Sequence, residues 1–334
     1  MEHEILVPLD GSAAAEAVLP QALLMAHATN STLHLLRVIP DLVSTILIWP
    51  AAIPLEFPVN TPELCAAAQG YLNQIVTALQ AQGDSVRTTV VVGDPASTIL
   101  AWATEHPVIR QIAMTTHGRS GVTRWILGSV AEKVLTATPV PLLLVRASAH
   151  HPAATRSTPA PDLALPIYRT IMVPLDGSAL AEQSLLLASM LARTTSAGLI
   201  LMHAIPTPND VVLARQGYSN GWDAPHLAQL CASAEEYLQT QALPSVTAGI
   251  AVRTLIHDGH PGEQIVTAAD AAGADLIVMS THGRSGFQRL WLGSTATHVV
   301  RHSSIAVLLV REEAPIHPAL LTAQVPKAKV SMPA

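Results

Sequence analysis

Charged residues and cysteines are scarce in this chain. Of its 334 residues only 13% are charged and two are cysteines, whereas 49% are hydrophobic. A chain this apolar buries a core, which excludes intrinsic disorder. Two cysteines are too few for the disulfide framework of a small secreted protein, and they suit a reducing cytosol.

Other signals are missing as well. No apolar stretch reaches the ~20 residues of a membrane span, because Pro, Asp, Arg or His interrupts each one. The acidic start, Met1 to Glu4, lacks the basic segment of a secretory signal. The net charge of −6 argues against general nucleic-acid binding, and no Gly-x-x-x-x-Gly-Lys-Ser/Thr loop marks a P-loop NTPase. We therefore expect a cytoplasmic protein that binds neither membrane nor nucleic acid.

The sequence instead contains a domain-sized repeat. Residues 7–12, Val-Pro-Leu-Asp-Gly-Ser, return verbatim at 173–178, and residues 116–121, Thr-His-Gly-Arg-Ser-Gly, return at 281–286. The offsets are 166 and 165, so the copies stay in register with one net deletion. This period far exceeds the ~20–50 residues of a solenoid unit. We predict two domains, residues 1–146 and 167–312, an Ala-, Pro-, Ser- and Thr-rich linker at 147–166, and a loosely ordered tail at 313–334.

Strand-like and helix-like segments alternate within each copy. In the first copy we predict strands at 4–9, 32–38, 85–92, 112–115 and 140–145, and helices at 13–30, 63–82, from 95 onward, and at 128–136. Such alternation implies parallel strands joined by right-handed crossovers, hence a three-layer α/β domain. Ligands bind such sheets at the carboxyl ends of the strands, where the strand order reverses.

Polar turns that contain glycine follow the predicted first and fourth strands of each copy, at the carboxyl ends where ligands bind. In the first copy they are Asp10, the turn at 115–118, and the Gly128-Ser129 pair that opens a helix. Their counterparts in the second copy are Asp176, the turn at 280–283, and Gly293-Ser294. Glycine lets the backbone approach a bulky anion, and a helix start favours phosphate. Arg119 is placed to neutralise phosphate charge, and Asp10 to accept hydrogen bonds from a ribose or an adenine amino group.

These motifs together resemble the universal stress protein family in a tandem two-domain form. The resemblance rests on Val-Pro-Leu-Asp-Gly-Ser, the Gly-Asp-Pro turn at 93–95, and Thr-His-Gly-Arg-Ser-Gly followed by Gly-Ser; it covers nearly all of residues 1–146 and 167–311. It implies Rossmann-like domains of the adenine nucleotide alpha hydrolase type. Each would be a five-stranded parallel sheet of order 3-2-1-4-5 with helices on both faces. The two domains would pair through their last strands as a pseudo-dimer, with further homo-oligomers left open.

The resemblance also implies a ligand, because family members with a Gly-x-x-Gly-x(9)-Gly-Ser/Thr motif bind ATP, with or without Mg²⁺. Carried across residue by residue, the implied phosphate and ribose contacts are Gly118, Gly128, Ser129 and Val130, with Gly283, Gly293, Ser294 and Thr295 in the second copy. The implied adenine and ribose contacts are Asp10 and Val38, with Asp176 and Ala204 in the second copy. Arg119 and Arg284 complete the set as partners of phosphate.

One position departs from the family's motif. Its first glycine is Thr115 in the first copy and Ser280 in the second. If the position needs positive φ, a β-branched threonine is costly there; if only a close approach is needed, a small side chain fits. This difference favours the second copy as the nucleotide binder. The copies also differ at Asp94, which is matched by His260, a sign either of unequal function or of surface drift.

Structural explanations compete with these roles. Asp10 and its counterpart are common helix caps, Arg119 and its counterpart fit solvated charges, and His117 fits a loop histidine hydrogen-bonded to backbone. No carboxylate or histidine is clearly placed to activate water, so we expect at most slow ATP hydrolysis. Two functions stay open. One is an ATP-binding stress-response or signalling protein that uses the nucleotide as a structural or regulatory ligand, and the other is a nucleotide-free scaffold that acts through protein association.

Overall fold

The computed structural model describes residues 3–41, 61–117, 127–146, 163–206, 224–281 and 292–311. Gly118, Arg119, Gly283 and Arg284 lie outside the described residues, as do most of the predicted linker and the whole of the predicted tail. At the described end of that linker Leu163 is buried in the core, so this part packs against the domains. Both cysteines, Cys65 and Cys231, are free and half-buried.

Domain one contains strands β1 to β5 and the helices between them. In chain order its elements are β1 (His3–Pro8), α1 (Ala13–Glu16), α2 (Leu19–Thr29), β2 (Ser31–Ile39), α4 (Thr61–Gln80), β3 (Val86–Val92), α5 (Pro95–Glu105), β4 (Ile109–Thr115), α6 (Ser129–Ala137) and β5 (Leu142–Val145). Asp94 caps α5, because its carboxylate accepts the backbone N–H of Ser97 at 3.0 Å, and Pro95 begins the helix as predicted.

Domain two repeats this order. Its elements are β6 (Thr170–Pro174), α7 (Ala179–Thr195), β7 (Gly198–Ile205), α9 (Ala224–Thr247), β8 (Val252–Asp258), α10 (Pro261–Ala271), β9 (Leu276–Ser280), α11 (Ser294–His302) and β10 (Ala306–Val310). None of the helices within the described ranges is long and apolar enough to cross a membrane.

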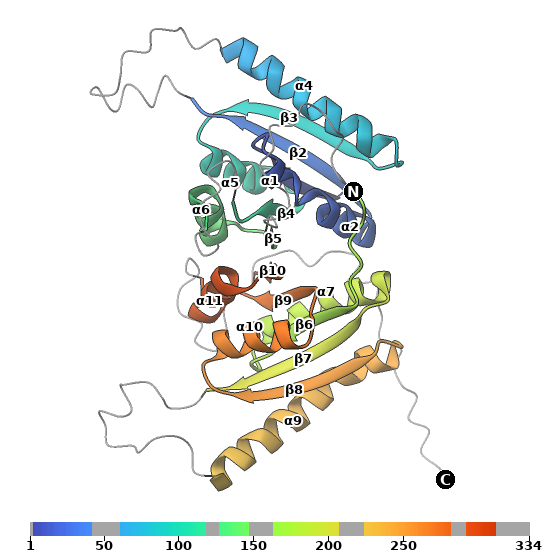
Figure 1. Ribbon diagram of the computed structural model, residues 1–334, viewed down its shortest axis with the longest axis vertical. Coiled ribbons are helices and arrows are strands. Elements are labelled where there is room, and N and C mark those ends of the chain that lie inside the picture. The colour runs from blue at the N-terminus through green and yellow to red at the C-terminus, as the bar shows by residue number, and fades with distance from the viewer. Residues whose placement is uncertain are drawn as a thin grey trace, which may run out of the picture.

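The two domains share one ten-stranded sheet of order β3-β2-β1-β4-β5-β10-β9-β6-β7-β8. The strands run parallel within each domain, and β5 pairs antiparallel with β10, with Leu143 opposite Leu308. The order 3-2-1-4-5 and the pairing of the last strands are therefore confirmed. In Figure 1 the domains consequently stack end to end about this pair of short strands.

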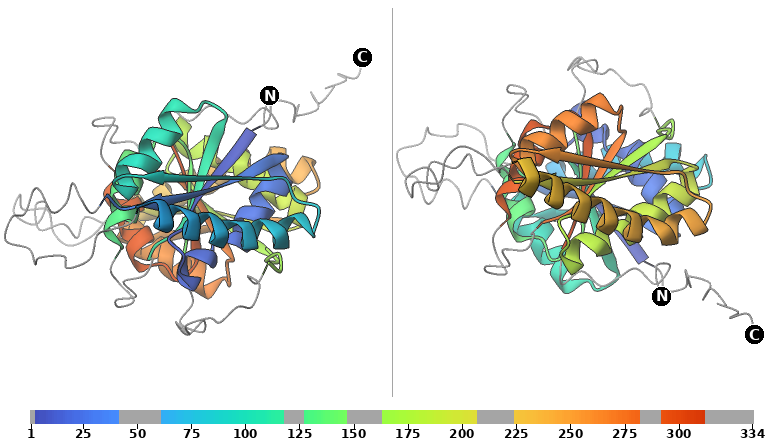
Figure 2. Two further views of the ribbon diagram at one scale, coloured as in Figure 1. Left: turned by 90° about the horizontal axis from the view of Figure 1, so that it is seen from above. Right: turned by 90° about the horizontal axis from the view of Figure 1, so that it is seen from below.

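Helices cover both faces of this sheet. Along β1, Ile5 and Val7 pack against α2 and α4, whereas Leu6 packs on the opposite side with α5 and α6. This alternation follows from the two-residue period of a strand. The views from above and below show α4 and α5 on opposite sides of β3, and α9 and α10 on opposite sides of β8 (Figure 2). Each face forms one apolar core that continues from domain one into domain two.

The predicted single helix at 13–30 is wrong, because it is two helices. α1 ends at Glu16 and α2 begins at Leu19, with Pro20 in its first turn. Proline lacks the N–H that would bond four residues back and its ring clashes there, so it fits only a helix start. In domain two Leu186 stands at this place and α7 runs unbroken for 17 residues.

The single net deletion between the copies lies at the start of the fourth strand. In domain one Glu4 pairs with Ile109 and Ile5 with Gln111, which leaves Arg110 as an extra residue in a bulge. In domain two Asp275 directly precedes the fourth strand, and its carboxylate accepts the backbone N–H groups of Arg169 and Thr170, at 2.7 and 2.9 Å. This difference between the copies is therefore a local adjustment of the strand pairing.

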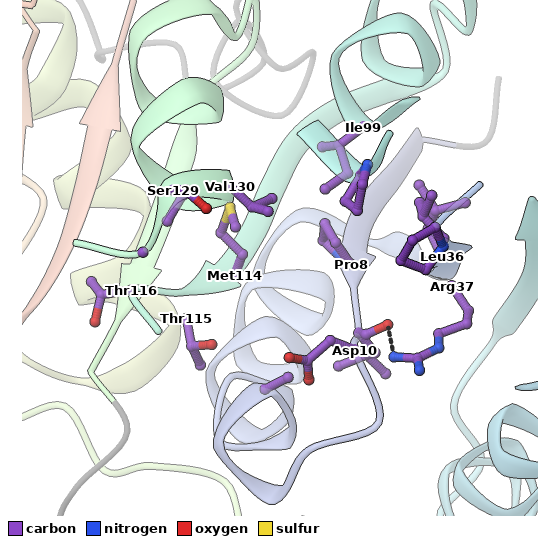
Figure 3. A pocket seen from close by; sticks show the side chains of 17 residues that line it. Pro8, Asp10, Leu36, Arg37, Ile99, Met114, Thr115, Thr116, Ser129 and Val130 are labelled. Atoms are coloured by element: carbon purple, nitrogen blue, oxygen red, sulfur yellow. Dashed lines mark hydrogen bonds between the residues drawn. The ribbon is translucent and has the colours of Figure 1, made fainter. Parts of the chain in front are cut away.

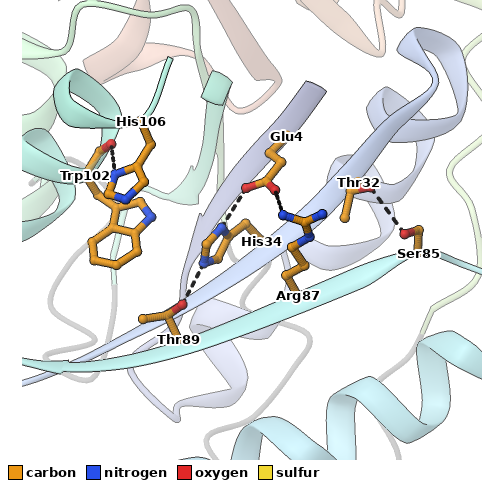
Figure 4. Close-up of polar contacts among 8 residues, drawn as sticks. All are labelled: Glu4, Thr32, His34, Ser85, Arg87, Thr89, Trp102 and His106. Carbon is orange, nitrogen blue, oxygen red and sulfur yellow. Dashed lines mark hydrogen bonds and ion pairs between the residues drawn. The ribbon is translucent and has the colours of Figure 1, made fainter. Parts of the chain in front are cut away.

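A polar network crosses the core of domain one (Figure 4). The buried Glu4 carboxylate bonds the His34 ring at 2.8 Å and the Arg87 guanidinium at 2.9 Å, and the other His34 nitrogen lies 2.9 Å from the Thr89 hydroxyl. The counterparts in domain two are Thr170, Ile200, Arg253 and Leu255. Because the second copy folds the same way with apolar residues at two of these places, the fold itself does not require the network.

Candidate functional site

Each domain has a cavity at the carboxyl ends of its strands. Cleft one, in domain one, measures about 330 Å³, and cleft two, in domain two, about 310 Å³. Cleft one opens beside β1 and β4, which are neighbours in the sheet although their sequences are about a hundred residues apart. The order of strands reverses at this point, so the loops after β1 and β4 diverge and leave a crevice.

Most of the described site residues predicted from sequence meet in these cavities. Cleft one is lined by Asp10, Val38, Thr115, Gly128, Ser129 and Val130 (Figure 3). Cleft two is lined by Asp176, Ala204, Ser280, Gly293, Ser294 and Thr295. The linings of the two clefts match position for position, so the duplication preserved the whole cavity as well as its motifs.

Asp10 does not cap the helix that follows it. Its Oδ1 accepts the backbone N–H of Ser12 at 2.9 Å and the Ser12 hydroxyl at 2.5 Å. Ser12 is itself the cap, because its hydroxyl oxygen accepts the N–H of Ala15 at 3.1 Å. Asp176 and Ser178 repeat this arrangement in domain two. These hydrogen bonds form a turn that holds the Asp10 carboxylate in one orientation beside the cavity.

The helices α6 and α11 point their N-termini at the clefts. Gly128 begins α6 without any side-chain cap, and the first N–H bonded within the helix is that of Glu132, to the Gly128 carbonyl. The N–H groups of Ser129, Val130 and Ala131 precede it and have no acceptor inside the helix. All three residues line cleft one. Gly293 begins α11 in the same way, with Thr297 making the first bond.

Gly128 lies in close approach to the end of the fourth strand. Its N–H donates to the Thr116 carbonyl at 2.9 Å, and a Cβ at this position would lie 3.2 Å from that same oxygen. The N–H of Gly293 donates to Thr281 at 2.9 Å in domain two. The glycine therefore draws the helix start onto the end of the fourth strand and keeps the main chain bare there.

The position where the motif has Thr115 and Ser280 does not need glycine. Both residues end extended strands, and among the described non-glycine residues positive φ occurs only at Asn30 and Ser196. The Thr115 hydroxyl donates to the His117 carbonyl at 2.8 Å, so it stabilises the start of the loop. Backbone strain at this position therefore gives no reason to prefer the second copy over the first.

Sequence reasoning missed the residues that form the sides of the cavities. Leu36, Ile99 and Met114 give cleft one an apolar lining, and Met202, Ile265 and Met279 do the same in cleft two. These residues belong to no motif. The repeat itself could have indicated them, because each pair is apolar at matching positions.

The clefts differ most in charge at one missed position, Arg37 in domain one and His203 in domain two. The Arg37 guanidinium donates to the Leu9 carbonyl at 3.1 Å, and the His203 ring Nδ1 donates to the Leu175 carbonyl at 2.7 Å. Both side chains therefore bind the end of the first strand across the cleft. Cleft one gains a fixed positive charge beside Asp10 that cleft two lacks.

A partly buried tyrosine lies next to each of these side chains. Arg37 lies over the Tyr71 ring, whose hydroxyl donates to Glu16 at 3.0 Å, and Tyr237 donates to Glu182 at 3.3 Å in domain two. Burial, with the adjacent Glu182 carboxylate, raises the pKa of Tyr237 to about 12. Burial, with the adjacent Glu16 carboxylate, also raises the pKa of Tyr71.

His117 has a different partner from the backbone group that the sequence suggested. Its Nδ1 lies 3.0 Å from the Thr116 hydroxyl. Burial and the charge of Arg146 lower the pKa of His117, which favours the neutral ring. His117 is not among the residues that line cleft one, and His282 lies outside the described residues.

Fold and clefts define a tandem α/β protein with two Rossmann-like domains. The model of the universal stress protein family matches residues 1–146 and 167–311. Universal stress protein Rv2005c of Mycobacterium tuberculosis is 24% identical over 321 residues, which cover 93% of this chain and 98% of the relative. The chain therefore belongs to the universal stress protein family, as a member with two tandem domains.

Solved structures include proteins similar to this chain. A putative universal stress protein from Pseudomonas aeruginosa is 19% identical, with a TM-score of 0.63, and the match covers 96% of this chain and 98% of that one. This likeness shows the fold. A universal stress protein solved in complex with cAMP is 26% identical over 44% of this chain and 98% of its own, with a TM-score of 0.33.

Proposed function

We propose that both clefts bind an adenine nucleotide, ATP with Mg²⁺, as a structural or regulatory ligand in stress response or signalling. The observation that carries this proposal is the uncapped start of α6 and α11 at the mouth of each cavity. Three backbone N–H groups without acceptors in their own helix, beside bare glycine, form a site for an anion. A helix N-terminus also carries about half a positive charge, which favours phosphate.

The remaining parts of each cleft suit the rest of the nucleotide. Leu36, Ile99 and Met114 offer apolar contacts to a purine ring. Asp10, fixed by its turn, accepts hydrogen bonds from ribose hydroxyls or the adenine amino group. The cavity volumes of about 330 and 310 Å³ lie at the lower end of the range of ligand pockets.

The described lining of the clefts favours a ligand role over hydrolysis. Asp10 is the one carboxylate among the described residues that line cleft one, and its Oδ1 already accepts two hydrogen bonds. A base that activates water must reach that water with an available lone pair and a matched pKa. We therefore propose that bound ATP persists and changes the stability or the partners of the protein.

Calorimetric titration with ATP and Mg²⁺ tests this function, and cAMP is the second ligand to titrate because a family member was solved with it. Gly128→Val places a branched side chain against the backbone of Thr116 and should abolish binding in cleft one. Gly293→Val makes the same change at the matching helix start, where the Gly293 N–H donates to the Thr281 carbonyl, and should abolish binding in cleft two. Gly70→Val is the matched control, because Gly70 lies exposed on α4 with nothing within 4 Å of an added Cβ. Absence of binding by the unaltered chain would leave the nucleotide-free scaffold as the function.

A further inference from the structure

Three histidines of domain two gather between α10 and α11. The ring centroids of His260 and His298 are 5.6 Å apart, and the rings of His298 and His302 stack at 4.1 Å. The counterparts in domain one are Asp94, Lys133 and Ala137. Domain two therefore has three neighbouring imidazole rings, here called the His260–His298–His302 cluster, where domain one has one acidic, one basic and one apolar residue.

This cluster borders cleft two. His260 stands at the N-cap position of α10, where its side chain makes no capping hydrogen bond, and directly precedes Pro261, which lines the cavity. His298 stands on α11 four residues after Ser294, another lining residue, which is about 6 Å along the helix axis. A charge on the cluster therefore lies within about one Debye length of an anion held at the start of α11.

The packing holds the cluster in place. A Cβ on Gly262 would lie 2.7 Å from the His298 Cβ, so α10 presents a bare glycine to that ring. The His302 Nδ1 donates to the His298 carbonyl at 2.8 Å.

The surroundings of His298 favour its neutral ring. Burial, followed by His302 and His260, lowers the pKa of His298, and the carboxylate of Glu263 on α10 opposes this effect. Two other charged groups of these helices have partners of their own, because Arg301 pairs with Glu132 at 2.8 Å and Asp270 accepts the Ser304 hydroxyl at 3.1 Å. Domain one differs, since it has no histidine at any of these three positions.

We propose that the His260–His298–His302 cluster makes nucleotide binding in cleft two depend on proton uptake, whereas cleft one binds with fixed charges. This inference rests on the proposed binding of ATP. An anion in cleft two stabilises a protonated ring, so binding and protonation favour one another. Affinity in cleft two therefore rises as the pH falls through the range in which histidine titrates. The two clefts of one chain would then fill in a ratio set by pH.

Titration of the two clefts separately tests this inference. Gly128→Val leaves cleft two for ATP and Mg²⁺, and Gly293→Val leaves cleft one, so each variant reports a single dissociation constant. Between about pH 8 and about pH 6 we expect the affinity of cleft two to rise about fivefold relative to that of cleft one. Cleft one controls for the protonation of ATP itself, which affects both clefts alike. His203 also lines cleft two, where cleft one has Arg37, so its contribution is separated from that of the cluster by the swap described next, which leaves His203 in place.

A swap of the cluster sharpens the test. His260→Asp, His298→Lys and His302→Ala together give domain two the residues of domain one and should abolish the extra pH dependence. Ring-proton NMR of the unaltered chain gives a second readout, in which ATP should raise the pKa of at least one of the three histidines. Equal pH dependence in the two clefts, or no such shift with cleft two filled, would overturn the inference. Absence of ATP binding at every pH would instead reject the proposed function itself.

Discussion

Arg146 and Arg311 occupy equivalent places after the last strands of the two domains, and each donates hydrogen bonds to the end of a helix in the other domain. The acceptors are the backbone oxygens of Val300 and Arg301 for Arg146, and of Leu135 and Thr136 for Arg311. Carbonyls at a helix C-terminus lack partners within the helix and carry partial negative charge. The pair therefore joins the domains at both sides of the β5–β10 contact.

We predict that Arg146→Met and Arg311→Met each lower the free energy of unfolding by about 1.5–3 kcal/mol, because each removes charged donors from helix-end carbonyls. Methionine keeps the apolar stem and removes only the guanidinium. Arg193→Met on the exposed surface of α7 is the control and should change stability by less than about 0.5 kcal/mol. Urea unfolding monitored by circular dichroism measures the difference, and equal effects of all three changes would contradict this role.

Thr115→Gly should leave ATP affinity unchanged and reduce stability by about 1–2 kcal/mol. The change restores the family's glycine, but the strand needs no positive φ, and the Thr115 bond to the His117 carbonyl is lost. Thr115→Ser keeps the hydroxyl, as in domain two, and should be nearly neutral. A tenfold gain in affinity in the glycine variant, measured by calorimetry, would show that the threonine obstructs the cleft.

We expect that removing Glu4 alone lowers the free energy of unfolding more than replacing the whole network with the residues of domain two. Glu4→Ala leaves His34 and Arg87 without their carboxylate and should lower stability by about 3 kcal/mol. The triple change Glu4→Thr, His34→Ile and Thr89→Leu installs the residues of domain two and should recover most of that loss. Chemical denaturation of both variants measures this, and a triple variant less stable than Glu4→Ala would refute the expectation.

The two partly buried tyrosines, Tyr71 and Tyr237, predict that the protein loses stability at high pH. Burial together with Glu182 raises the pKa of Tyr237 to about 12, and burial with Glu16 raises that of Tyr71 as well. The unfolded chain loses these protons near the ordinary tyrosine pKa of about 10. Stability is therefore fully present below about pH 10 and declines as the pH rises toward about 12. Tyr71→Phe with Tyr237→Phe should make this decline shallower in urea unfolding; an unchanged slope would show that other groups cause it.

Much of the fold followed from local patterns in the sequence. The alternation of apolar runs and helical segments predicted the strands of both copies, and Asp94-Pro95 marked the start of α5 correctly. The strand order and the pairing of the last strands came from the family resemblance. Pro20 was overlooked inside an Ala- and Leu-rich run, although a proline there is a signal for a new helix start.

Local sequence patterns do not show which side chains are brought together by strands far apart in the sequence. Arg37 and His203 enter the clefts because the end of the second strand lies beside the first, a relation fixed by sheet pairing. Glu4, His34 and Thr89 come from three strands separated by 30 and 55 residues. The motifs located the clefts, and the folded sheet determined which further side chains line them.

The number of ATP molecules bound per chain tests the central claim most directly. Equilibrium dialysis against saturating ATP and Mg²⁺, with the unaltered full chain, gives this number without any variant that must fold. Because both clefts keep an uncapped helix start beside bare glycine, we predict two molecules per chain. A value of zero at millimolar ATP would contradict the account.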